Sequence, residues 1–196
     1  VRDRGFERLL ALVDAGVLDE ATTCDAATTL LRETWEPWHA LEVIQHGLAR
    51  WPASAALLRL RAAVWLGLAT DVDGVGEHIP VGYSVDVLGN PFHPGSAGAA
   101  LAYCEALPDA AWDADLHERH AAVRAHLADY EAAARAYRAA AARLEQDLRE
   151  LADREERNSL REKMAALHGE AEACDRGPAG LIAAQQRGME ELMGRL

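Results

Sequence analysis

The first seventy residues carry apolar side chains at intervals of three and four positions, which is the spacing of amphipathic helices. In the first of these stretches the apolar positions are Phe6, Leu9, Leu10, Leu12 and Val13, and Gly16 follows them as a stop signal. Pro37 stands where proline is favoured, at the first position of a helix. The pattern predicts four helices, over 4–15, 19–34, 37–50 and 55–68.

The segment between residues 70 and 96 interrupts this helical pattern. Residues 70–98 hold six of the fifteen glycines and three of the seven prolines of the chain. From Val81 to Val87, apolar and polar residues alternate, which is the period of an extended strand. A connection of this length is usually functional or disordered, and its Val, Ile, Tyr and Phe residues argue against disorder. We therefore expect one long, irregular, acidic loop over about 70–96, with a short extended segment inside it as one alternative.

Helical spacing returns after this loop. Ser96 is the predicted N-cap of a helix over 96–107 that ends before Pro108. Beyond residue 130 two alternatives stay open. The first is one unbroken helix over 130–174, and the second is a new helix that begins at the capping box Ser159–Glu162.

A Gly-Pro pair at residues 177 and 178 marks a clear break, and we expect a final amphipathic helix over 179–194. Leucine and methionine side chains form apolar stripes along the last two predicted helices. Stripes of this kind can mediate self-association, which is one hypothesis for this end of the chain.

Two stretches of the chain resemble the tetratricopeptide repeat (TPR). The first is Ala40-Leu41-(x2)-Ile44-(x2)-Gly47-Leu48-(x3)-Pro52, and the second is Ala128-Asp129-Tyr130-Glu131-Ala132-Ala133-(x3)-Tyr137-(x2)-Ala140. In that family, small residues let the two helices of a pair approach closely, while a bulky residue fills the remaining gap. The first helices depart from the pattern. Cys24 and His117 stand where the family usually has a bulky aromatic residue, and Arg124 stands where it has a tyrosine.

The resemblance implies an all-α fold in which antiparallel helix pairs stack as a short TPR-like superhelix. The chain would be a single domain with four parts. They are N-terminal helix pairs over 1–69, the acidic insertion loop over 70–96, a second set of helix pairs over 97–154, and C-terminal helices over 155–196.

The resemblance also implies that the first helix of each pair lines a concave groove for a partner. The residues that would face this groove are Asp25, Thr29, Arg32, Arg59, Glu118 and His126. Tyr83, in the alternating part of the loop, is a further candidate contact, because an extended segment can pair with an edge strand of a partner. Of the five tryptophans, we expect most to pack between helices and one or two to be exposed as partner anchors.

Composition and charge narrow the class of partner. Half of the 196 residues are hydrophobic, and the formal net charge is −12. A charge of this sign argues against a nucleic-acid partner, whose phosphates need clustered Lys and Arg, and against an anionic membrane surface. It suits a basic or apolar segment of another protein. The charged N-terminal residues, and the lack of a run of about eighteen apolar residues, predict neither a secretion signal nor a membrane span.

The three cysteines, Cys24, Cys104 and Cys174, are far apart and include no CxxC pair. Their number and spacing predict neither a disulfide framework nor a thiolate zinc site, and reduced thiols in the cytoplasm are the simplest interpretation. No catalytic motif is complete in the sequence, and the Gly74-Val75-Gly76 run is too short for a dinucleotide-binding loop. We therefore expect a protein- or peptide-binding adaptor without a cofactor, rather than an enzyme.

The alternative hypothesis is an accessory subunit or small enzyme, with a metal or ligand site formed by the 71–93 loop and helix histidines. His117 and His120 are three residues apart on one predicted helix, so they can share a face. The loop would add the candidate ligands Asp71, Asp73, Glu77 and His78. Neither set forms a complete motif, since His117-Glu118-Arg119-His120 is one residue shorter than the metalloprotease pattern His-Glu-x-x-His.

Overall fold

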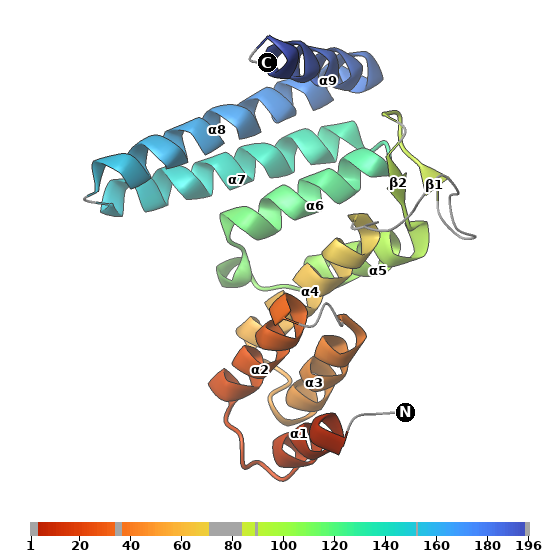
Figure 1. Ribbon diagram of the computed structural model, residues 1–196, viewed down its shortest axis with the longest axis vertical. Helices are drawn as coiled ribbons and strands as arrows, with labels where there is room; N and C mark the ends of the chain where they lie inside the picture. Colours follow the sequence, from red (N-terminus) through yellow and green to blue (C-terminus); the bar gives the residue numbers. More distant parts are fainter. Residues whose placement is uncertain (1–3, 34–36, 71–83, 89, 152, 195–196) are drawn as a thin grey trace.

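The computed structural model of the chain describes residues 4–33, 37–70, 84–88, 90–151 and 153–194 (Figure 1). Within these ranges the protein is an all-α arrangement of packed helices, as the sequence predicts. The first four helices are α1 (Arg4–Asp14), α2 (Glu20–Glu33), α3 (Pro37–Arg50) and α4 (Ala55–Thr70). The later helices are α5 (Pro94–Glu105), the short 3-10 helix η1 (Asp109–Ala111), α6 (Ala114–His126), α7 (Tyr130–Glu150), α8 (Arg154–Asp175) and α9 (Gly177–Met193).

The helices stack in sequence order along the long axis of the molecule, with α1 and α9 at opposite ends (Figure 1). Consecutive helices pack against each other in α2 with α3, α4 with α5, α6 with α7, and α8 with α9. Helix α4 also links neighbouring parts of the stack, because it contacts α2 and α6 as well as α3 and α5. This connectivity is compatible with a helical repeat fold.

The hydrophobic core is distributed along the stack rather than gathered at one centre. The buried side chains of α1–α4 form one cluster around Ile44 and Leu57. A second cluster around Leu66 and Leu116 joins α4, α5 and α6, and a third around Tyr137 joins α6–α9. Each cluster shares a helix with the next, which is how repeat proteins gain stability from nearest-neighbour packing.

Small side chains lie where the helices approach most closely. Ala40, Ala133 and Ala140 are fully buried, and Gly47 is buried on α3. A Cβ atom built on Gly47 would lie 2.9 Å from Leu57 Cδ1 and 3.1 Å from Thr23 Cγ2. Burial of these four small positions agrees with the packing that the sequence predicts.

Two glycines set helix ends through their backbone conformation. Gly16 follows α1 with φ of +70°, and Gly177 is the first residue of α9 with φ of +65°. Both values fall in the left-handed region, where glycine carries no Cβ penalty. The predicted stops after α1 and before α9 are therefore confirmed.

The predicted N-cap Ser96 is wrong, because α5 begins two residues earlier, at Pro94. His93 is the N-cap, and its Nδ1 accepts a hydrogen bond from the backbone N–H of Ser96 at 3.0 Å. Proline at the first position of the helix needs no hydrogen-bond acceptor, so the helix extends back to Pro94.

The unbroken helix over 130–174 is also wrong, and the second helix begins before the predicted capping box at Ser159. After α7 the chain turns and α8 lies alongside it (Figure 1). Asp153 caps α8, since its Oδ1 accepts hydrogen bonds from the N–H groups of Glu155 and Glu156 at 2.8 and 2.9 Å. A side-chain oxygen that satisfies two free N–H groups fixes the helix start at that point.

A small hairpin lies within the predicted loop. Its strands, β1 (Ser84–Val85) and β2 (Pro91–Phe92), are antiparallel, with Ser84 opposite Phe92. Asp86 closes the turn, because its Oδ1 accepts hydrogen bonds from the N–H groups of Leu88 and Asn90, both at 2.8 Å. Residues 71–83 of the predicted loop lie outside the described residues.

Candidate functional site

A groove of about 680 Å³ crosses α2, α4 and α6, which are the first helices of three successive packed pairs. Apolar side chains form most of its lining, and a few charged side chains lie among them. The apolar lining residues are Leu31, Pro37, Leu60, Ala63, Val64, Leu68 and Leu116. Gly67 also lines the groove, and no atom lies within 4 Å of a Cβ atom built on it. An apolar hollow with a few polar groups is typical of a binding site.

Two ion pairs stand along this groove. Arg59 of α4 pairs with Asp113, the residue that precedes α6. Asp113 also caps α6, since its Oδ1 accepts a hydrogen bond from the Leu116 N–H at 2.8 Å. On α6 itself, Arg119 Nε lies 2.9 Å from Asp115 Oδ2. The Arg59–Asp113 pair therefore connects two of the helices that form the groove.

A second hollow of about 490 Å³ lies between α6, α7 and α8 and shares Asp115 and Arg119 with the first groove. The two hollows are therefore neighbours on α6. The further lining residues are Thr70, Glu118, Ala122, Tyr137, Lys163, Ala166, Leu167 and Glu170. Lys163, the only lysine of the chain, lies with Nζ 2.8 Å from Glu118 Oε2.

The electrostatics of the second hollow favour a positive charge. Partial burial, together with the Glu118 carboxylate, raises the pKa of Glu170 above its ordinary value. Burial, followed by the nearby carboxyl group of Glu170, raises the pKa of the Tyr137 hydroxyl. Burial is the main cause of both shifts, and the neighbouring carboxyl groups add to it.

Only some of the residues predicted to face a groove line one of the two hollows. Arg59 lines the first groove and Glu118 lines the second hollow. On α2, however, Asp25 and Thr29 are exposed outside the lining of the groove, and Thr28 and Leu31 line it instead. The side chain of Arg32 and all of Tyr83 lie outside the described residues.

His126 contacts the hairpin rather than either hollow. Its Nδ1 lies 2.7 Å from Asp86 Oδ2, and its ring stacks on Phe92 with centroids 5.6 Å apart. These contacts join the end of α6 to the segment before α5.

His117 and His120 both pack on one tryptophan. The ring of His117 stacks on Trp112 with centroids 4.6 Å apart, and His120 meets the same ring edge-on at 5.3 Å. Burial and the positive charge of Arg143 lower the pKa of His117. Burial, Arg124 and His117 lower the pKa of His120 to about 4.

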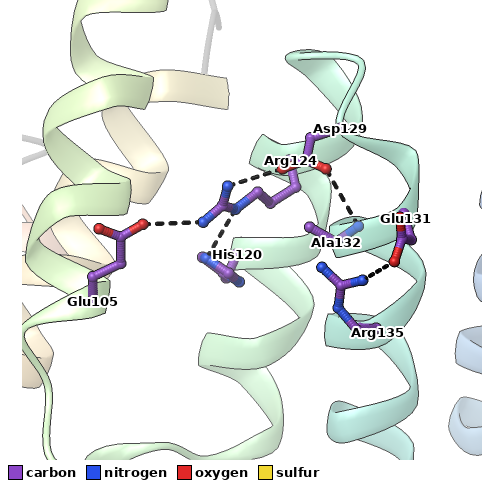
Figure 2. Close-up of polar contacts among 7 residues, drawn as sticks. All are labelled: Glu105, His120, Arg124, Asp129, Glu131, Ala132 and Arg135. Atoms are coloured by element: carbon purple, nitrogen blue, oxygen red, sulfur yellow. Dashed lines mark hydrogen bonds and ion pairs between the residues drawn. The ribbon is translucent and has the colours of Figure 1, made fainter.

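Arg124 lies between His120, Glu105 and Asp129 (Figure 2). Its guanidinium donates to Asp129 Oδ2 at 2.9 Å, to Glu105 Oε1 at 3.3 Å and to His120 Nε2 at 3.4 Å. Asp129 is also the N-cap of α7. The side chain thus connects α5, α6 and the start of α7, which is a packing role.

The remaining candidate metal ligands, Asp71, Asp73, Glu77 and His78, lie outside the described residues. Among the residues that the structure describes, no group of three or more His, Cys, Asp or Glu side chains could hold a metal ion.

All three cysteines are free thiols, and Cys104 and Cys174 are buried. Burial raises the pKa of Cys104 to about 12 and that of Cys174 to about 11. A thiol with a raised pKa is protonated at neutral pH and is a poor nucleophile. These two residues therefore belong to the packing of the helices.

Among the tryptophans that the structure describes, Trp38 is strongly exposed. Trp38, near the start of α3, is 63% exposed, and its ring meets Trp65 of α4 edge-on with centroids 5.9 Å apart. The expectation that one or two tryptophans are exposed is confirmed for this residue.

Comparisons with known proteins return no similar protein: no family profile, no curated protein and no solved structure matches the chain. Within the described part of the chain, no helix is both long enough and apolar enough to cross a membrane.

Proposed function

We propose that the chain is a protein-binding adaptor module whose helix pairs form a short TPR-like array, and that the groove across α2, α4 and α6 binds a segment of a partner protein. The observation that carries the proposal is that one groove is lined by the first helices of three successive pairs. Stacked helix pairs create extended concave binding surfaces in this way.

The chemistry of the groove supports a peptide segment as its ligand. Leu31 and Leu60 offer apolar contact area, and the Arg59–Asp113 ion pair offers charged groups that can fix the orientation of a bound chain. The net charge of −12 favours partners that carry basic residues, because complementary charge speeds association and suppresses wrong partners. With three free thiols, we place this function in the cytoplasm.

The proposal is tested by selecting binders from a random peptide library and measuring their affinity for two variants. Gly67→Phe places a ring in the groove without an internal clash, because the space around the Gly67 Cβ position is open. Gly169→Phe is the matched control, since Gly169 lies on the exposed surface of α8 and has equally open surroundings.

We expect selected peptides to lose affinity at least about tenfold for Gly67→Phe and to bind Gly169→Phe like the unsubstituted protein. Peptides that bind both variants equally well would place the binding surface elsewhere and contradict the proposal. A library that yields no binder would contradict it as well.

A further inference from the structure

The second hollow contains the hydroxyl group of a largely buried tyrosine. Tyr137 is 9% exposed and lines the hollow, and among the described residues its hydroxyl group makes no hydrogen bond. The hydroxyl oxygen is not one of the buried polar atoms without a partner, so it reaches the solvent in the hollow. It can therefore exchange a hydrogen bond to water for one to a ligand.

The same hollow also contains one carboxylate more than its cationic side chains can neutralise. Arg119 pairs with Asp115, and Lys163 pairs with Glu118. These pairs leave Glu170, which forms no hydrogen bond or ion pair within the described part of the chain. The raised pKa of Glu170 agrees with this surplus of negative charge.

We infer that the second hollow binds the side chain of an arginine residue in the partner segment, with its guanidinium between Glu170 and the Tyr137 hydroxyl. This inference rests on the proposed function, because the hollow adjoins the peptide groove through Asp115 and Arg119. An arginine that follows the groove-bound part of a peptide would reach the hollow across α6.

The chemistry of the hollow suits arginine better than lysine. The two groups to be satisfied come from different helices, Tyr137 from α7 and Glu170 from α8. A planar guanidinium presents five donors in a fork and can serve both acceptors, whereas an ammonium is a compact point charge. Ala122, Ala166 and Leu167 provide apolar surface for the carbon stem of the arginine side chain.

The test uses N-acetyl-arginine amide as the probe and N-acetyl-citrulline amide as its neutral isostere, in titrations followed by NMR of the whole chain. The arginine probe should give saturable shifts at Tyr137 and Glu170, and the citrulline probe should give none there. Glu170→Gln removes the charge that the ligand needs. The control, Glu172→Gln, removes the same charge from an exposed position on the same helix.

We expect Glu170→Gln to weaken binding of the arginine probe about tenfold or more, since a hydrogen bond to a charged group is lost, and Glu172→Gln to leave binding unchanged. Tyr137→Phe should weaken binding by a smaller factor. The NMR spectrum of each free variant shows whether it is folded. Equal binding of the two probes, or equal binding by the protein and Glu170→Gln, overturns the inference.

The outcome is separable from that of the proposed function. If peptides lose affinity for Gly67→Phe but bind Glu170→Gln normally, the results support the peptide groove and contradict the arginine site. If the arginine probe binds as expected but peptides bind Gly67→Phe as well as the unsubstituted protein, the results support the arginine site and contradict the peptide groove.

Discussion

Gly47 of α3 lies so close to Leu57 of α4 that a Cβ atom at position 47 would stand 2.9 Å from Leu57 Cδ1. Leu57 and Thr23, the second neighbour of this site, are both fully buried and have no free space into which to move. A glycine at this point therefore lets α3 approach α2 and α4 together. This close approach is the kind of contact on which stacked helix pairs depend.

Replacement of Gly47 tests this contact directly. We expect Gly47→Leu to lower the free energy of unfolding by about 3 kcal/mol, because overpacking a fully occupied core costs more than the gain in helix propensity. Gly169→Leu, where the surroundings are open, should raise it by about 1 kcal/mol. Urea unfolding of both variants measures the difference, and equal stability of the two would show that no close approach exists at position 47.

The first four helices were predictable from the sequence because their signals are local. Apolar residues at helical spacing, together with Gly16 and Pro37, fix their ends within a few residues. The start of α5 was not predictable, since an imidazole acts as its N-cap and histidine is not among the preferred capping residues. The start of α8 was predicted too late, at the capping box Ser159–Glu162, because Asp153 was not considered as a cap; in the structure its carboxylate is the N-cap of this helix.

Only part of the groove lining could be predicted, because the rotation of a helix about its axis depends on tertiary contacts. Arg59 was predicted correctly as a lining residue from its position on the first helix of a pair. On α2 the lining residues Thr28 and Leu31 are displaced by one position from the predicted Asp25, Thr29 and Arg32. One residue turns a helix by about 100°, and the burial of Thr23 and Ala27 sets that rotation through tertiary contacts.

Asp153 offers a test of the break between α7 and α8. Asp153→Ala should lower the free energy of unfolding by about 1 kcal/mol, because the N–H groups of Glu155 and Glu156 lose their acceptor. Asp153→Ser should keep most of the stability. Asp147→Ala, on the exposed side of the last turns of α7, should cause no loss. If Asp153→Ala left the free energy of unfolding unchanged, the Asp153 cap would not determine where α8 begins.

His120 predicts a pH dependence of stability. In the folded protein the pKa of His120 is lowered to about 4 from 6.5, because burial, Arg124 and His117 disfavour the proton more than Asp129 favours it. Between these two values the unfolded chain binds more protons than the folded protein. The contribution of His120 to stability is therefore complete above pH of about 6.5 and is lost as the pH falls towards 4, by an amount on the order of 3 kcal/mol.

The measurement compares the urea stability of the protein and of His120→Phe at several pH values across this range. We expect the variant to lose less stability on acidification than the unsubstituted protein. His168→Phe, at an exposed position of α8, serves as the control and should follow the unsubstituted protein. Parallel curves for all three proteins would show that His120 does not titrate differently on folding.

Self-association stays a prediction, and α9 is the helix that tests it. Ile182, Met189 and Met193 are exposed and share one face of this helix. If this face pairs with a second copy, the sedimentation coefficient should rise with concentration, and Met189→Glu should abolish the rise by placing a charge in an apolar contact. Arg187→Gln changes the net charge by the same amount on the opposite side of α9 and should have no effect. A sedimentation coefficient that is independent of concentration would contradict the prediction.

Chemical-shift mapping of a selected peptide on the labelled protein shows whether a partner segment binds in the groove across α2, α4 and α6. We expect the largest perturbations to fall on Leu31, Ala63 and Leu116, which line the groove. Perturbations confined to the exposed Trp38 face, or to the exposed face of α9, would contradict it.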